Sequence, residues 1–144
     1  TEQQPISINK PIIFVNSAAL DDPTALRIAN EIGSRLAEAS FDKGLSTTRT
    51  FRTAGAEDVL EWTDAYNDSR NKEGTVCKRT GTNGDYYGVL RGASNVQVPG
   101  LIIEHGFHTV PEVRQAAVNE DLKNVWSKAD AEGIAAGFGL LENE

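Results

Sequence analysis

The residues best suited to chemistry lie together in the stretch 98–112. An apolar run at 101–103 is typical of a buried strand, and Glu104 follows it, with both histidines of the chain, His105 and His108, directly after. A carboxylate at a strand end can act as a general base on water, and partial burial raises its proton affinity. Ligands of open α/β sheets bind beyond the carboxyl ends of the strands. We therefore expect Glu104 to mark the site, although a solvated or arginine-paired glutamate is the simpler alternative.

Other chemistries fit the sequence less well. His105 and His108 are too few for a catalytic zinc site, which needs three protein ligands. Glu104 and His105 are consecutive strand residues, so we expect them to point to opposite faces. Each histidine can instead be a hydrogen-bonded core residue or a loop residue that contacts substrate. The chain has no Gly-x-Ser-x-Gly elbow, phosphate loop or dinucleotide fingerprint. We expect Arg91 to end a neighbouring strand and to pair with a carboxylate, either of the protein or of a substrate.

The length, net charge and cysteine count of the chain limit the classes of protein to consider. The 144 residues fit one domain with a moderate core. A net charge of −7 argues against nucleic-acid and anionic-membrane partners. No apolar run approaches the length of a membrane span. No signal peptide is visible, but a mature secreted chain also lacks one. Cys77 is the single cysteine, so it cannot form an internal disulfide, and we expect a structural role for it.

The elements that must position Glu104 alternate between strands and helices. Asp22 and Pro23 are typical of a helix start, and Asn119 is typical of the cap of a final helix. After a polar lead-in over residues 1–9, we expect strands or extended segments at 10–16, 46–52, 76–80, 86–90 and 101–104, the last being central. We expect helices at 23–40, 57–66, 111–118 and 120–140, with a turn at 81–85. This order predicts an α/β fold with a mostly parallel twisted sheet flanked by helices.

Two blocks of the sequence resemble a known enzyme family. They read Asp-Tyr-Tyr-Gly-Val-Leu-Arg at 85–91 and Val-Pro-Gly-Leu-Ile-Ile-Glu-His-Gly-Phe at 98–107. Together they resemble the C-terminal half of the zinc-dependent N-acetylmuramoyl-L-alanine amidases, the cell-wall amidases that include clostridial and phage lysins. The segment 12–39 is similar to the one after that family's third zinc ligand, and the closing helix is similar to its last helix. Residues 10–144 then form the C-terminal part of the catalytic domain, with 53–75 as an insertion.

The resemblance implies a function. In the family, the glutamate that matches Glu104 is the catalytic acid and base, and the substrate is peptidoglycan. The bond cleaved joins N-acetylmuramic acid to L-Ala of the stem peptide. Arg91 and His108 are then expected to contact the anionic stem or the glycan. A secreted autolysin, acting outside the cell on a bacterial cell wall, is the class of protein that this implies.

The chain also departs from the family pattern. The family's zinc ligands (His, Glu and His) lie in its N-terminal half, in motifs that this chain lacks, and Val110 replaces the usual asparagine while Pro111 is retained. The resemblance therefore implies an incomplete domain lacking its N-terminal strands, with the zinc ligands in an N-terminal fragment of the same protein. The chain is then a piece of a cleaved protein with the other piece docked, or a shortened chain. A degenerate homologue that binds peptidoglycan without cutting it, and a purely structural domain, are the alternatives.

Overall fold

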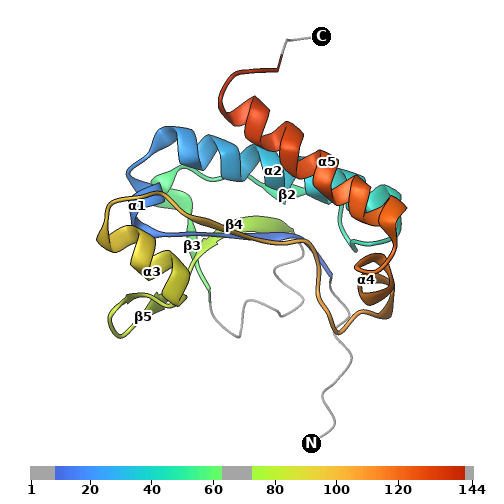
Figure 1. Cartoon of the computed structure of the whole chain (residues 1–144), viewed down its shortest axis with the longest axis horizontal. Helices are drawn as coiled ribbons and strands as arrows, with labels where there is room; N and C mark the ends of the chain where they lie inside the picture. Colours follow the sequence, from blue (N-terminus) through green and yellow to red (C-terminus); the bar gives the residue numbers. More distant parts are fainter. Residues whose placement is uncertain (1–8, 63–72, 142–144) are drawn as a thin grey trace, which may run out of the picture.

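The computed structural model describes residues 9–62 and 73–141. They form a mixed α/β fold in which helices flank a mostly parallel sheet, as expected (Figure 1). The elements are β1 (Ile12–Val15), α1 (Ser17–Leu20), α2 (Pro23–Asp42), β2 (Phe51–Arg52), the 3₁₀ turn η1 (Ala56–Asp58), β3 (Leu60–Glu61), β4 (Gly74–Lys78), β5 (Thr80–Gly81), β6 (Gly84–Asp85), α3 (Gly88–Asn95), β7 (Leu101–Glu104), α4 (Pro111–Ala116) and α5 (Glu120–Gly137).

Among the described strands of the sheet, β7 alone runs antiparallel to its neighbour. The strand order is β2-β4-β1-β7, and β3 also pairs with β4. Strands β1, β2 and β3 all run parallel to β4, whereas β7 runs antiparallel to β1. The expectation that β7 is central was wrong, because within residues 9–62 and 73–141 it pairs with β1 alone and ends the strand order. The continuous apolar run of β7 is typical of an interior strand. The sequence pattern therefore predicted a central position for it.

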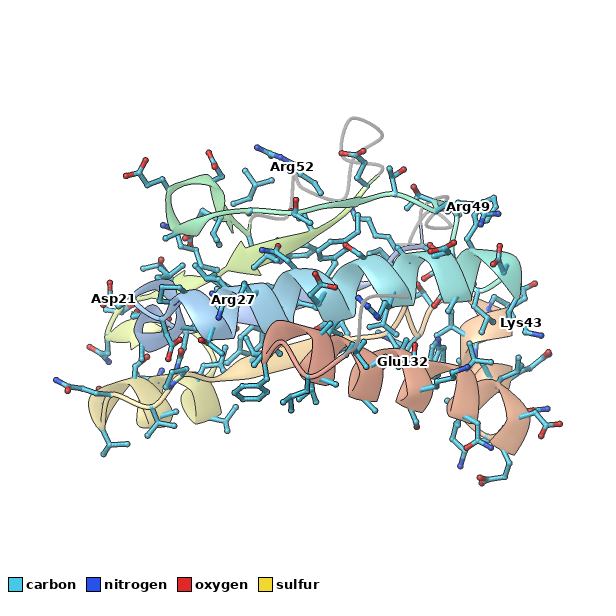
Figure 2. All side chains as sticks on the ribbon, turned by 90° about the horizontal axis from the view of Figure 1, so that it is seen from above. Asp21, Arg27, Lys43, Arg49, Arg52 and Glu132 are labelled. Carbon is cyan, nitrogen blue, oxygen red and sulfur yellow. The ribbon has the colours of Figure 1, made fainter. Side chains whose placement is uncertain are left out.

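Helices α2 and α5 lie side by side over one face of the sheet (Figures 1 and 2). Both begin at the predicted caps. Asp22 accepts hydrogen bonds from the backbone N–H groups of Thr24 and Ala25, and Asn119 accepts one from that of Leu122. These bonds satisfy N–H groups that have no partner within the helix. The larger core cluster lies between these helices and the sheet.

Two glycines of α5 let it approach α2 closely. A Cβ atom on Gly133 would lie 2.5 Å from the Cα of Ile32, and one on Gly137 would lie 2.6 Å from the Cα of Ile28. Both contacts involve backbone atoms, so no side-chain rotation could relieve them. The two helices therefore touch along a seam that tolerates no side chain at these positions.

The opposite face of the sheet carries a smaller apolar cluster. Its buried members are Ile12, Phe14, Cys77 and Leu90, and the aromatic rings of Trp62 and Tyr87 pack edge-on against Phe14. Burial raises the pKa of the Cys77 thiol to about 12. The thiol is therefore protonated at neutral pH, which fits the structural role expected for it.

Three local expectations were wrong. Residues 86–90 are not an extended segment, since α3 begins at Gly88 and buries Leu90 against the second cluster. Only Phe51 and Arg52 of the expected strand 46–52 join the sheet. Ser46 and Thr47 instead hydrogen-bond through their side chains, which competes with strand pairing.

The third error is the helix expected at 57–66. The structure has η1 and the short strand β3 there, and residues 63–66 lie outside the described ranges. The expected turn at 81–85 is confirmed: β5 and β6 form a hairpin, with Gly84 at a φ of +106°. Within residues 9–62 and 73–141, no helix is both long and apolar enough to cross a membrane.

The helix seam gives a direct test of the fold. We expect Gly133→Ala to destabilise the protein by about 1–3 kcal/mol, because the new methyl group forces α5 away from α2. Gly92→Ala is the matched control, since a Cβ there meets nothing within 4 Å. Gly92 lies inside α3, so this change should stabilise by up to about 1 kcal/mol through helix propensity. Urea unfolding of both variants measures the change in the free energy of unfolding. Equal changes in the two variants would contradict the close packing of α5 on α2.

Candidate functional site

Glu104 is the last residue of β7 and lies opposite Ile12 of β1. Side chains alternate along a strand, so Glu104 shares the second face of the sheet with Ile102, Ile12 and Phe14. It is half-buried beside the apolar cluster. Burial raises the pKa of Glu104 above its ordinary value of 4.5, and the positive charges of Arg79 and His108 partly oppose this rise. The result is a carboxyl group that holds its proton to higher pH than a solvated glutamate.

The antiparallel direction of β7 changes which end of the sheet Glu104 occupies. Because Glu104 pairs with Ile12, it lies at the amino end of β1. The expectation that it stands beyond the carboxyl ends of the parallel strands was therefore wrong, since that rule applies to strands that run in the same direction. The carboxyl end of β1 instead holds the buried carboxylate of Asp85. This carboxylate accepts hydrogen bonds from the hydroxyl groups of Ser17 and Ser94.

Two buried asparagines fix the ends of β7, and the first is Asn16. Its side chain, which is fully buried, makes four hydrogen bonds. The Nδ2 group donates to the carbonyls of Leu90 and Val98, at 3.2 and 2.9 Å. The Oδ1 atom accepts from the backbone N–H groups of Ala19 and Gly100, both at 2.9 Å. Asn16 follows β1 directly and Gly100 precedes β7, so these bonds hold the start of β7 beside the end of β1.

The second asparagine, Asn9, holds the other end of β7. Its Oδ1 accepts a hydrogen bond from the backbone N–H of Phe107 at 2.8 Å, and its Nδ2 donates to the carbonyl of Leu45 at 2.6 Å. Gly106 passes close to this side chain, because a Cβ there would lie 3.2 Å from the Asn9 Oδ1 and 3.0 Å from Val113. Glycine at position 106 therefore permits a close approach of the backbone to both side chains. Neither asparagine was identified from the sequence, since their partners are up to 98 residues away.

The two histidines have different surroundings. His105 points away from Glu104, as expected, and lies on the helix-covered face, where its Nε2 is 2.8 Å from Asp130 Oδ2 and its ring packs on Trp126. It is therefore a hydrogen-bonded residue beside the core, on the opposite face from Glu104. His108 is exposed and its charge acts on Glu104. The structure thus brings His108, and not His105, into the electrostatic surroundings of the carboxylate.

Arg91 is not where the sequence pattern put it. It lies within α3 rather than at a strand end, because residues 88–95 are helical. Its Nη1 group donates to the carbonyls of Asp85 and Tyr86, at 3.1 and 3.4 Å. Arg79, and not Arg91, is the arginine whose charge opposes the raised pKa of Glu104, and it was not identified from the sequence. Its guanidinium lies 3.7 Å from the ring centre of Tyr86. Stacking of a guanidinium on an aromatic face is a favourable contact.

A metal site needs several ligand side chains close together. In the ranges 9–62 and 73–141, no three His, Cys, Asp or Glu side chains lie close enough together to hold a metal ion. The described residues therefore do not form a metal-binding site by themselves. Searches against protein-family models, curated proteins and solved structures find no match to the chain.

The four hydrogen bonds of the Asn16 side chain predict a large loss of stability when this side chain is removed. We expect Asn16→Ala to destabilise the protein by about 3 kcal/mol or more, because buried backbone groups lose their partners. Asn124, exposed on α5, provides the control, and its change to alanine should alter stability by less than about 0.5 kcal/mol. Urea unfolding followed by circular dichroism measures both. A mild effect at Asn16 would contradict its proposed importance.

The raised pKa of Glu104 predicts a pH-dependent effect of Glu104→Gln. A raised pKa means that folding favours the protonated acid, so this contribution to stability is present below pH 4.5 and is lost as the pH rises through the folded-state pKa. The glutamine variant should therefore be more stable than the wild type at about pH 7.5, with the difference shrinking at about pH 4. Exposed Glu57→Gln is the control, with an effect below about 0.5 kcal/mol at either pH. Equal stability of wild type and Glu104→Gln at both pH values would argue against the burial.

Proposed function

We propose that this chain is the glutamate-bearing part of a peptidoglycan amidase that acts in a bacterial cell wall, outside the cell. The bond cleaved is the amide between N-acetylmuramic acid and L-Ala of the stem peptide. The observation that carries the proposal is the half-buried carboxyl group of Glu104, with its raised pKa, at the end of a strand whose sequence resembles the amidase motif. The fold, an α/β sheet flanked by helices, is compatible with such an enzyme and does not by itself indicate one.

The chemistry assigned to Glu104 is proton transfer. An efficient general base has a pKa close to the working pH, so burial tunes this carboxylate in the useful direction. Glu104 takes a proton from the attacking water, whose oxygen bonds to the amide carbonyl carbon. It then returns the proton to the nitrogen of L-Ala as the carbon–nitrogen bond breaks. Both steps need only one carboxyl group, which acts first as base and then as acid.

The zinc of such an enzyme must be held by another segment. A catalytic zinc site has three protein ligands, and residues 9–62 and 73–141 do not offer three grouped ligands. We propose that the ligands lie in an N-terminal part of the same protein that joins this chain at Glu104. His105 is an unsuitable substitute, because it hydrogen-bonds to Asp130 on the opposite face.

The structure supports the two expected substrate contacts, His108 and Arg91, to different degrees. His108 is exposed and its charge reaches Glu104, which supports a contact with the anionic stem or the glycan. Arg91 has less support, because its guanidinium donates to two backbone carbonyls of the segment before α3. We therefore retain His108 as the preferred substrate contact and Arg91 as a secondary one.

The experiment that tests the function is Glu104→Gln in the polypeptide extended by the coding sequence directly upstream of Thr1. Turnover of purified peptidoglycan should fall by roughly 10³-fold, since the proton carrier is lost. Bound zinc, measured by atomic absorption, should be unchanged. Glu57→Gln is the matched control and should retain full activity.

Two outcomes would overturn this assignment. Near-normal turnover in Glu104→Gln would remove the proposed role of the carboxylate. Retention of the wild-type protein on insoluble peptidoglycan, without release of stem peptides and without bound zinc, would favour the alternative of a non-catalytic binding module.

A further inference from the structure

The tip of the β5–β6 hairpin carries the one asparagine–glycine dipeptide of the sequence, Asn83–Gly84. Every other asparagine of the chain is followed by a residue that has a side chain. The backbone nitrogen after an asparagine can attack the carbonyl carbon of that asparagine's side chain. Glycine hinders this attack least, because it has no Cβ atom and few restrictions on its backbone angles. The sequence therefore makes Asn83 the asparagine most open to this reaction.

The structure leaves the dipeptide accessible. The hairpin lies beside α3 at the periphery of the molecule (Figure 1), and both Asn83 and Gly84 are exposed. A Cβ on Gly84 would meet only the Cγ of Arg91, at 4.0 Å, so the space around the attacking nitrogen is open. The side chain of Asn83 makes no hydrogen bond to residues 9–62 and 73–141. It can therefore turn toward the nitrogen of Gly84.

Other asparagines of the chain are held in place by their side chains. Hydrogen bonds to backbone groups fix the side-chain amides of Asn9, Asn16, Asn30 and Asn119. A side chain fixed in this way cannot rotate toward the nitrogen of the next residue. Asn95 and Asn124 are exposed, but each of them precedes a valine, whose branched side chain crowds the nitrogen. Asn83 thus differs from these six in both its freedom and its neighbour.

The tip of the hairpin is weakly held, although its base is not. At the base, Thr80 and Asp85 are fixed by hydrogen bonds that involve side chains, whereas residues 82–84 are all exposed. Gly84 lies opposite Gly81 in the last pair of a short ladder, so this pair alone covers its nitrogen. A two-stranded hairpin is only marginally stable by itself. The last pair therefore opens at little cost in free energy and releases the nitrogen of Gly84.

We propose that Asn83 is a site of spontaneous deamidation. The backbone nitrogen of Gly84 loses its proton and bonds to the side-chain carbonyl carbon of Asn83. The bond from that carbon to the amide nitrogen breaks, ammonia leaves, and a cyclic succinimide remains. Water then adds to either carbonyl group of the ring and opens it, which leaves an aspartyl or an isoaspartyl residue at position 83. Water is the only co-reactant, and the reaction does not depend on the proposed amidase activity.

Both products change the hairpin. Each adds a negative charge at position 83, and the isoaspartyl product also adds a carbon atom to the backbone. The longer backbone does not fit the register that places Gly84 opposite Gly81. Tyr86, two residues after the dipeptide, packs its ring 3.7 Å from the guanidinium of Arg79. The isoaspartyl product is therefore expected to loosen the hairpin beside this contact.

Incubation of the purified full chain, followed by brief acidic digestion and peptide mass spectrometry, tests the proposal. Deamidated peptide that spans position 83 should accumulate at least about 10-fold faster than deamidated peptides that contain Asn95 or Asn124. The rate should rise with pH, because the attack requires a deprotonated nitrogen. Isoaspartyl methyltransferase with labelled S-adenosylmethionine is the probe for the isoaspartyl product, and it should label the protein increasingly with incubation time.

A pair of variants assigns the label to one residue. Asn83→Ser should keep the circular dichroism spectrum of the wild type and should lose most of the methyltransferase label. Asn95→Ser is the matched control and should be labelled as the wild type is. Deamidation at position 83 that is no faster than at Asn95 and Asn124 would overturn the proposal, and so would a label that persists in Asn83→Ser. If Asn83→Ser fails to fold, the time course of the wild-type chain still decides the question.

Discussion

The site depends on two buried asparagines at opposite ends of β1. Asn16 holds the residue before β7 and Asn9 holds a residue after it, both through backbone N–H groups. A buried amide must satisfy its polar atoms, and leaving them unpaired is costly. Each asparagine therefore fixes the chain near one end of β7, and together they set the register that brings Glu104 opposite Ile12. Without these two contacts, a four-residue strand at the edge of the sheet would have little to define its position.

The register in turn decides the chemistry of Glu104. A shift of one residue would move Glu104 to the helix-covered face and His105 to the second face. In the observed register, the carboxylate lies beside the apolar cluster and its pKa is raised, while His105 is hydrogen-bonded to Asp130. The same antiparallel register leaves Leu101 and Ile103 with outward backbone groups. The raised pKa of Glu104 and the outward direction of these backbone groups thus have one structural cause.

Much of the local structure was predictable because its signals are short-range. Asp22 and Asn119 cap their helices through bonds that span two or three residues. The hairpin at Gly84 likewise follows from a conformation that glycine adopts readily. Errors arose where distant contacts overrode local preference. Residues 86–90 contain β-forming side chains, yet α3 forms there because Leu90 is buried against the second cluster.

The sequence by itself determined the α/β class, the boundaries of α2, α4 and α5 to within a few residues and the choice of Glu104 as the residue to examine. It also determined that Glu104 and His105 diverge, because alternation along a strand needs no tertiary information. Only the tertiary structure decided the antiparallel direction of β7, its place at the end of the strand order among residues 9–62 and 73–141, and the engagement of Arg91 by backbone carbonyls. The physical reason is that pairing direction and register depend on contacts such as Asn9 to Phe107, between residues far apart in the chain, which leave no periodic pattern in the sequence.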